Sequence, residues 1–350
     1  HANPIKLKDY IYECDKFEQF MGKLLGNGII DCIFAYPTRF FDVDGTLTIE
    51  QDDQKIIVPE GTLTALKKAH DAGVLLFANT GRPYGTVHPV IKALPLDGFV
   101  CGCGTWIMSN GKEVFRHEIE RAERIEIMRK VKELNLSCVY EAKEGFAVTD
   151  PLNHGPMNDI VKTYLQDGFQ LLEVNDDLVF EKFCLFKNRE DQWPDLSFLK
   201  DYDKMYRYGY FVEVVPLACS KGKAIQSLMK ELNVSYENSY SFGDSVNDVE
   251  MLKVTKYSIV MGNAPEEVKR CADYTTLSND EDGAAIAIER AFEEENEKPE
   301  EDQEVPVDVL NAQNKNTLMG ALGMQYTFAS PHRVEATMPV DGRTRQPFGI

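Results

Sequence analysis

Two aspartates, Asp42 and Asp44, stand two positions apart in the stretch RFFDVDGTLT, directly after an apolar pair. If the strand that ends there continues through them, both side chains point to the same side and the carboxylates converge. Such like charges are unfavourable unless a divalent cation neutralises them or one carboxyl stays protonated as a general acid. The pair predicts one of these two sites, and a solvated surface turn is the alternative that the motif alone leaves open. A calcium loop is excluded, because Leu47 stands where such a loop requires glycine.

Three further segments place polar side chains where predicted strands end or helices begin. FANTGRP offers a hydroxyl and a backbone N–H, CSKGKA offers an ammonium, and SFGDSVNDVEML offers an acidic cluster. The first two suit phosphoryl oxygens and the third suits a hard cation. A turn cap, a surface lysine and a capped loop would each explain one segment, but the shared placement favours one phosphate and metal site. The residues concerned are Thr80, Gly81, Lys221, Asp244, Asn247 and Asp248.

The elements around these motifs alternate between strand and helix. Residues 59–73 carry apolar side chains at helical spacing up to Gly73, and the buried strand VLLFANT follows. The same alternation returns from about residue 217 to the end of GAAIAIERAF. We therefore predict an α/β fold, with a doubly wound parallel-sheet core formed by residues 39–105 and 217–295.

In residues 106–216 helices alternate with longer, aromatic strands. We therefore predict that these residues form an inserted α/β cap domain, which covers the strand ends where ligands bind. Its aromatic segments LVFEKFCLFK and MYRYGYFVEVVP are typical of strands. Lys182 and Arg207 in these strands could contact substrate, but we expect solvated charges on exposed strands.

The two ends of the chain fit the core less well. Residues 1–38 receive no assignment, and Pro37 is expected to shorten the first central strand to little more than RFF. The acidic residues 296–310 are expected to form a solvated linker. The segment 311–350 reads as a helix and two strands.

Composition excludes several classes of function. The net charge of −19 repels a phosphate backbone, so we expect no nucleic-acid partner. No apolar run approaches the roughly 20 residues that span a bilayer, and no signal peptide is evident, so we expect a cytoplasmic protein without a membrane partner. The eight cysteines are scattered, and buried free thiols explain Cys101 and Cys103 better than a zinc site does.

The order of the motifs resembles that of the haloacid dehalogenase (HAD) superfamily, whose four motifs correspond here to DxDGT, Thr-Gly-Arg, Lys-Gly and GDxxND. The long insertion and the later segments MGNAPEEVKRCADYTT and NDEDGAAIAI are similar to the Cof-type, IIB branch. The resemblance covers about residues 39–294 and implies a Rossmann-like core with a cap. It also implies a Mg²⁺-dependent phosphatase of small phosphorylated metabolites, of the sugar-phosphate type.

The resemblance also implies roles for individual residues. Asp42 would be the nucleophile that becomes an aspartyl phosphate, and Asp44 the general acid and then base. Phosphoryl oxygens would be bound by Thr80, Gly81 and Lys221, with Asn263 near the substrate phosphate. The magnesium ion would be held by Asp42, the Asp44 carbonyl and Asp244, with Asn247 nearby, and Asp248 would orient Lys221.

Some features depart from this pattern or extend beyond it. Cys103 and Gly104 stand where relatives commonly carry Asn-Gly. The tail, notably VEATMPVDGRTRQPFGI, resembles the start of a hotdog-fold thioesterase of the phenylacetate type, without the His-Gly-Gly segment that follows in that family. We expect no thioesterase activity from this chain. A phosphatase–thioesterase fusion that is truncated here, a phosphomutase and a non-catalytic scaffold are the alternatives.

Overall fold

The computed structural model describes residues 37–50, 55–150, 152–297, 307–313, 323–330 and 333–337. The chain divides into two units, and the larger one comprises Pro37–Leu232 and Tyr236–Ala291. Every candidate site residue lies in this larger unit. Most of the unassigned N-terminal segment, residues 1–36, lies outside the described residues.

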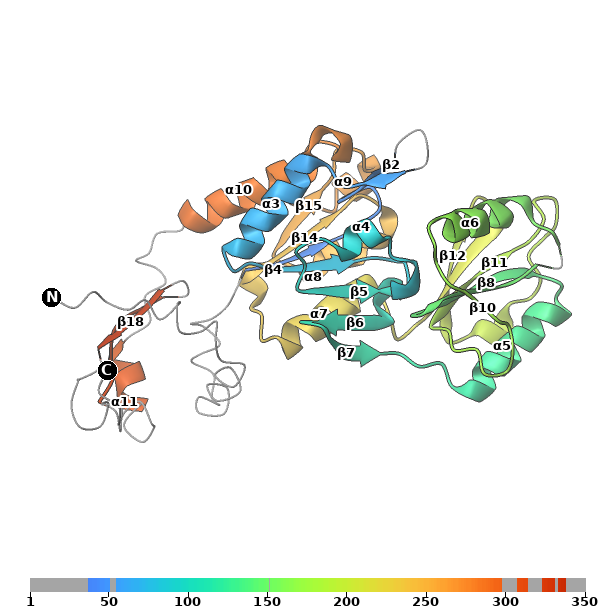
Figure 1. Ribbon diagram of the computed structural model, residues 1–350, viewed down its shortest axis with the longest axis horizontal. Coiled ribbons are helices and arrows are strands. Elements are labelled where there is room, and N and C mark those ends of the chain that lie inside the picture. The colour runs from blue at the N-terminus through green and yellow to red at the C-terminus, as the bar shows by residue number, and fades with distance from the viewer. Residues whose placement is uncertain are drawn as a thin grey trace. The chain divides into compact units, whose positions relative to one another are not determined.

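Eight strands form the core sheet in the order β16-β15-β14-β1-β4-β5-β6-β7 (Figure 1). The six strands from β16 to β5 run parallel, and β6 and β7 are antiparallel additions at one edge. The bounds are β1 Thr38–Phe41, β4 Leu75–Asn79, β5 Gly98–Cys101, β6 Trp106–Ser109, β7 Lys112–Arg116, β14 Ser239–Gly243, β15 Tyr257–Val260 and β16 Tyr274–Thr275.

Helices cover both faces of this sheet, with α3 and α10 on one face and α7 and α8 on the other (Figure 1). The parallel core sheet and the separate mixed cap sheet confirm the predicted α/β fold class. The bounds are α3 Glu60–Asp71, α4 Pro89–Lys92, α7 Lys221–Glu231, α8 Val249–Val254, α9 Glu266–Lys269 and α10 Gly283–Glu297. A short hairpin, β2 Ile49–Glu50 with β3 Ile56–Ile57, precedes α3.

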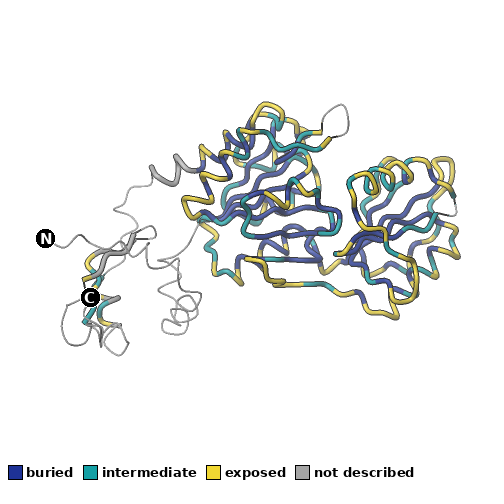
Figure 2. Tube along the Cα trace, in the orientation of Figure 1, coloured by how far each residue is buried: buried dark blue, intermediate teal, exposed yellow. Residues whose placement is uncertain are grey.

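The central strand β1 is buried on both faces, as a parallel sheet covered by helices requires (Figure 2). Phe40 stacks on Phe77 and Phe41 stacks on Phe242, at centroid distances of 5.7 and 4.5 Å. The strand is as short as expected, since it begins directly after Pro37 and consists of TRFF. All four residues from Thr38 pair with both neighbouring strands, because Pro37 precedes the strand and its carbonyl accepts from Leu75 N–H.

Six strands form a separate cap sheet in the order β10-β9-β8-β11-β13-β12, which is antiparallel except for the β10–β9 pair. Helices α5 Arg121–Glu133 and α6 Gly155–Gln166 accompany it. The strand bounds are β8 Ser137–Ala142, β9 Gly145–Thr149, β10 Leu171–Leu172, β11 Lys182–Phe186, β12 Tyr202–Arg207 and β13 Phe211–Pro216.

Two details of the cap differ from the sequence prediction. The residues from Trp106 to Arg116, assigned to the start of the cap, extend the core sheet as β6 and β7; the division into domains otherwise stays a prediction. MYRYGYFVEVVP is a hairpin rather than one strand. Tyr208 and Gly209 both have positive φ, at 54° and 74°, as a tight turn between antiparallel strands requires.

Lys182 and Arg207 also differ from the expectation of solvated charges. The Lys182 side chain is only 3% exposed and forms ion pairs with Glu141 and Glu213. The Arg207 side chain is 37% exposed and lies 3.7 Å from Glu213. The exposed-strand expectation is therefore wrong for Lys182, because the strand that carries it is central to the cap sheet rather than at its edge.

The described part of the tail contains α11 Val307–Gln313 and the antiparallel pair β17 Gln325–Ser330 with β18 Arg333–Thr337. The Asn311 side chain bonds both backbone groups of Tyr326, at 2.7 and 2.9 Å, and so joins the helix to the first strand. Helix α10 extends to Glu297, just inside the predicted linker. Residues 298–306 lie outside the described residues.

Candidate active site

Three neighbouring strands bring the predicted residues to one edge of the core sheet. Asp42 follows β1, Asp244 follows β14 and Thr80 follows β4. Because these strands are parallel and adjacent, their carboxyl ends meet at the same edge. The Asp42 N–H donates to Phe242 O at 2.8 Å, which fixes the aspartate at the end of the central strand.

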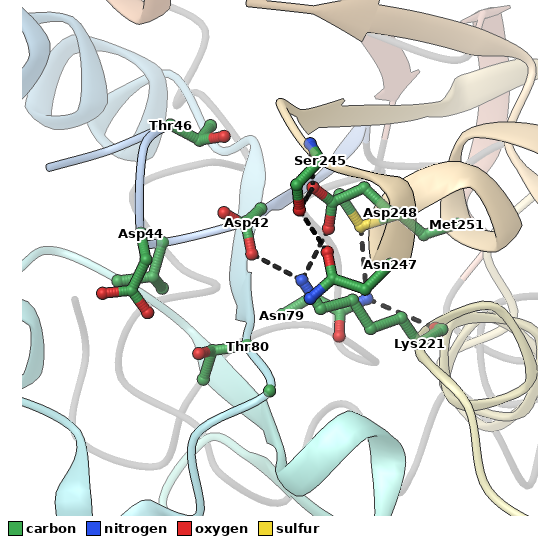
Figure 3. Close-up of polar contacts among 12 residues, drawn as sticks. Asp42, Asp44, Thr46, Asn79, Thr80, Lys221, Ser245, Asn247, Asp248 and Met251 are labelled. Carbon is green, nitrogen blue, oxygen red and sulfur yellow. Dashed lines mark hydrogen bonds and ion pairs between the residues drawn. The ribbon is translucent and has the colours of Figure 1, made fainter. Parts of the chain in front are cut away.

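Lys221 lies at the first position of α7, where Ser220 caps the helix by accepting from Lys223 N–H. Its ammonium contacts Asp42 Oδ1 at 2.5 Å and Asp248 Oδ1 at 2.6 Å (Figure 3). Burial lowers the pKa of Lys221, but Asp248 and Asp42 outweigh this effect and raise it above its usual range. The lysine is therefore a fixed positive charge in the cluster.

Asp248 holds this lysine in place and is itself held by backbone N–H groups. Its Oδ2 accepts from the N–H groups of Asp244 and Ser245, at 3.1 and 2.9 Å. Both carboxylate oxygens are thus engaged, one by the ammonium and one by the loop after β14. The geometry agrees with an orienting function for Asp248, which stays a prediction.

Three aspartates form a group that could hold a metal ion. Asp42, Asp244 and Asp248 each offer an oxygen within 4.8 Å of the others. Burial and the neighbouring carboxylates of Asp248 and Asp244 raise the pKa of Asp42 well above its usual range, against the opposing effect of Lys221. Burial and Asp248 raise the pKa of Asp244 to about 6. The cluster carries excess negative charge that a bound cation would neutralise.

The donor set fits a hard divalent cation, since the available ligands are carboxylate oxygens. Both oxygens of Asp248 are engaged by Lys221 and by backbone N–H groups, whereas Asp42 uses only Oδ1 to contact Lys221. Thr46 Oγ1 donates to Asp244 Oδ1 at 3.3 Å and thereby orients that carboxylate. The structure thus includes Asp248 in the acidic group, as the SFGDSVNDVEML segment suggested, whereas the family resemblance implied only that it orients Lys221.

Gly45 makes room for the Asp244 carboxylate. Its φ is +90°, and a Cβ there would lie 2.5 Å from Asp244 Oδ2. We expect Gly45→Ala to displace this carboxylate and to weaken Mg²⁺ binding about 10-fold. The Mg²⁺ affinity is measured from the increase in unfolding temperature as Mg²⁺ is added. Gly111→Ala is the matched control, because φ is +72° there and no atom lies within 4 Å of the added Cβ. Equal Mg²⁺ affinity in both variants would contradict the expectation.

The loop of residues 80–86, called here the Thr80 loop, lies beside the aspartates. Its Arg82 N–H donates to Thr80 Oγ1 at 3.1 Å. Neighbouring backbone supports it, because Gly102 N–H donates to Arg82 O at 2.8 Å and Cys103 N–H donates to Thr80 O at 3.2 Å. Cys103 itself has φ of 57° between two glycines of positive φ, so this supporting turn is left-handed throughout.

The structure does not bring the Asp44 carboxylate into the acidic group (Figure 3). Arg82 binds it through two contacts, both of 2.8 Å, and the Asp44 side chain is 45% exposed. The expectation that an extended strand aligns Asp42 with Asp44 is wrong, because β1 ends at Phe41 and the two aspartates lie in the following turn. Arg82 belongs to the Thr-Gly-Arg motif, but no role for it was predicted from the sequence.

Two predicted asparagines have contacts of different kinds. Asn247 is half-buried, and its Oδ1 accepts from the hydroxyl of Ser245 within the same loop. The exposed Asn263 donates to Gly45 O at 3.0 Å and to Asp244 Oδ2 at 3.4 Å. Asn263 therefore supports the metal side of the site, and its predicted contact with phosphate stays untested.

Asn79 is a site residue that sequence reasoning missed. It ends β4, is fully buried, and donates to Lys221 O at 3.2 Å. This bond ties the start of α7 to the strand that carries Thr80. Its position directly before Thr80 in FANTGRP was the available signal.

Solved structures share the fold of this chain. The subclass IIB sugar phosphatase BT4131 matches with a TM-score of 0.60 at 24% identity, covering 72% of this chain and 98% of that chain. BT1666 from Bacteroides thetaiotaomicron matches with a TM-score of 0.62 at 22% identity, covering 76% and 97%. At these identities the likeness concerns the fold alone, a parallel core sheet with a separate mixed cap sheet.

Sequence relatives cover the same region. Phosphatase YwpJ of Bacillus subtilis (strain 168) is 28% identical over 285 residues, covering 70% of this chain and 95% of that protein. The 5-amino-6-(5-phospho-D-ribitylamino)uracil phosphatase YcsE of the same organism is 29% identical over 258 residues, covering 71% and 92%. The HMP-PP phosphatase of Yersinia pestis (strain Pestoides F) is 30% identical over 250 residues, covering 67% and 87%.

Residues 39–288 match the haloacid dehalogenase-like hydrolase family. The chain belongs to this family and is a phosphatase of the HAD superfamily. The match ends before the tail, so the resemblance to a thioesterase receives no support from these relatives. Among the described residues, no helix has the length and apolar character needed to cross a membrane. The described cysteines are buried except Cys271, which is half-buried.

Proposed function

We propose that this chain is a Mg²⁺-dependent phosphatase of small phosphorylated metabolites that acts through an aspartyl phosphate on Asp42. One observation carries the proposal. Asp42 lies at the end of the central strand, 5% exposed, in contact with the Lys221 ammonium and grouped with Asp244. A carboxylate held at such a point can attack phosphorus in line while fixed charges stabilise the transferring group.

In the first half-reaction, a carboxylate oxygen of Asp42 forms a bond to phosphorus as the bond to the leaving oxygen breaks. Asp44 gives its proton to that oxygen, so the product leaves as a neutral alcohol. Thr80 and Lys221 bind phosphoryl oxygens, and the Gly81 N–H adds a third donor. Lys221 stays protonated during this step because two carboxylates hold its proton.

In the second half-reaction, the Asp44 carboxylate takes a proton from water, and the water oxygen attacks phosphorus. The bond between phosphorus and Asp42 breaks, which releases phosphate and restores both carboxyl groups. Asp44 must leave Arg82 to reach the leaving oxygen, because Arg82 engages both of its carboxylate oxygens. Arg82 therefore acts as the resting partner of Asp44 between turnovers.

A bound Mg²⁺ would be held by carboxylate oxygens of Asp42 and Asp244 and by the Asp44 carbonyl, and it would neutralise charge on the phosphoryl group. Asn263 would orient the Asp244 ligand through its amide. Without the ion, Asp42 would have to approach an anionic phosphate while grouped with two other carboxylates. This repulsion is the physical reason for the metal requirement.

Removal of divalent cations is therefore expected to reduce phosphatase activity more than about 100-fold, and added Mg²⁺ should restore it. The measurement is release of p-nitrophenol from p-nitrophenyl phosphate after treatment with EDTA and gel filtration. Potassium chloride at matched ionic strength controls for general screening of charge. Full activity in the metal-stripped protein would reject the magnesium proposal.

The substrate class rests on the relatives rather than on the site. Two of them are named for phosphorylated metabolites, the ribitylaminouracil phosphate and HMP-PP. We propose a small phosphorylated metabolite, with sugar phosphates as the first group to test. A panel of phosphorylated sugars, nucleotides and vitamin precursors, assayed for free phosphate with Mg²⁺, tests this choice. Turnover of p-nitrophenyl phosphate without turnover of any small metabolite would contradict it.

A further inference from the structure

A buried group of three charged side chains lies at the centre of the cap sheet. Glu141, Lys182 and Glu213 come from the adjacent strands β8, β11 and β13, and none has a side chain more than 12% exposed. The Lys182 ammonium lies 3.1 Å from Glu141 Oε2 and also contacts Glu213 Oε1. Burial lowers the pKa of Lys182, but the two glutamates outweigh this effect and raise it well above its usual range.

The third partner of this ammonium belongs to the core. Lys182 Nζ donates to Gly81 O at 2.9 Å, in the Thr80 loop. A buried ammonium is tolerated when it is paired and hydrogen-bonded, and two hydrogen bonds together with the Glu141 ion pair meet that need here. A group that served only to pack the cap would complete its bonds within the cap sheet. Lys182 instead forms a hydrogen bond with a residue outside the cap, Gly81, which directly follows Thr80.

One peptide unit connects Lys182 with the Thr80 hydroxyl. The Gly81 carbonyl and the Arg82 N–H belong to the same planar peptide. Its carbonyl accepts from Lys182, and its N–H donates to Thr80 Oγ1 at 3.1 Å. Because the plane is rigid, a bond that fixes the carbonyl also fixes the N–H. The hydroxyl then has one lone pair engaged and its hydrogen left to donate.

We propose that Lys182 is a positioning residue of the phosphatase, which orients the Thr80 hydroxyl toward the phosphoryl group through the Gly81–Arg82 peptide. This inference rests on the proposed phosphate-binding function of Thr80. The buried group would then do more than stabilise the cap. When the cap contacts the core, Lys182 would keep the Thr80 hydroxyl directed toward the phosphoryl group.

The test is a double-mutant cycle in kcat/KM for p-nitrophenyl phosphate with Mg²⁺. Lys182→Met alone removes the ammonium from two buried carboxylates, leaving Glu213 only the longer contact with Arg207, and can unfold the cap. The cycle therefore uses Lys182→Met with Glu141→Gln and Glu213→Gln, which removes all three charges together. This charge-free variant and Thr80→Val are measured alone and combined. Lys187→Met is the matched control, because Lys187 is a buried cap lysine whose ammonium donates to the carbonyls of Asn188 and Arg189, lies over the Trp193 ring and forms no ion pair with a described residue.

We expect the charge-free variant to lower kcat/KM about 10- to 100-fold and Thr80→Val to lower it about 100-fold. If both changes remove the same oriented hydroxyl, Thr80→Val should lower kcat/KM less than about 3-fold further in the charge-free background. Lys187→Met should retain wild-type kcat/KM. Fully additive losses, or wild-type kcat/KM in the charge-free variant, would overturn the inference while the proposed function stands. A wild-type protein without turnover would overturn both.

Discussion

Asp42→Asn is expected to lower phosphatase activity by about 10⁴-fold or more, the scale seen when a covalent nucleophile is removed. The amide oxygen is neutral and a poor nucleophile, so the aspartyl phosphate cannot form. The measurement is kcat/KM for p-nitrophenyl phosphate with saturating Mg²⁺. Activity within about 10-fold of wild type would show that phosphorus is attacked by another group.

The same substitution should leave the fold intact, which separates a chemical effect from unfolding. The acidic group contains three carboxylates, and within the described residues Lys221 forms ion pairs with two of them, Asp42 and Asp248. Removing one negative charge relieves repulsion, and Lys221 keeps Asp248 as its partner. Without divalent cations, Asp42→Asn should therefore unfold at the same temperature as wild type or a few degrees higher. A large fall in that temperature would mean that the activity loss is structural.

Lys221→Met is expected to reduce both stability and activity. It leaves the buried carboxylates of Asp42 and Asp248 without their ammonium, and loss of one partner of a buried ion pair destabilises by about 3–5 kcal/mol. Denaturant unfolding without divalent cations measures the change in the free energy of unfolding. Added Mg²⁺ should recover part of the stability, but activity should stay low because one phosphate ligand is missing.

Lys187→Met is again the control for this substitution, because it removes a buried lysine that donates to backbone carbonyls and forms no ion pair with a described residue. It leaves no carboxylate unpaired, so its effect on the free energy of unfolding should be much smaller. Equal losses in the two variants would mean that Lys221 contributes packing rather than charge balance.

The sequence was informative wherever a side chain's place follows from a strand end. Asp42, Thr80 and Asp244 each end a buried apolar run, and parallel strands bring such ends to one edge, so their proximity could be predicted. The helix stop at Gly73 was also predictable, and its φ of 86° is the left-handed conformation that favours glycine.

Contacts that depend on packing between distant segments could not be predicted. Arg82 pairs with Asp44 because a turn after β1 directs that carboxylate away from Asp42, and no periodicity encodes this turn. Lys182 has the sequence signature of an exposed strand residue. Its burial depends on two glutamates from other strands and a carbonyl from the core. The Tyr208 turn lacks the usual Asn-Gly or Asp-Gly signal.

The central claim is that Asp42 bonds covalently to phosphorus. Quenching the protein during turnover and reducing it with borohydride converts an aspartyl phosphate into homoserine, which peptide mass spectrometry locates in the chain. We predict homoserine at position 42, dependent on substrate and absent from Asp42→Asn. Steady turnover with an unmodified Asp42, or with homoserine at another aspartate, would contradict the account.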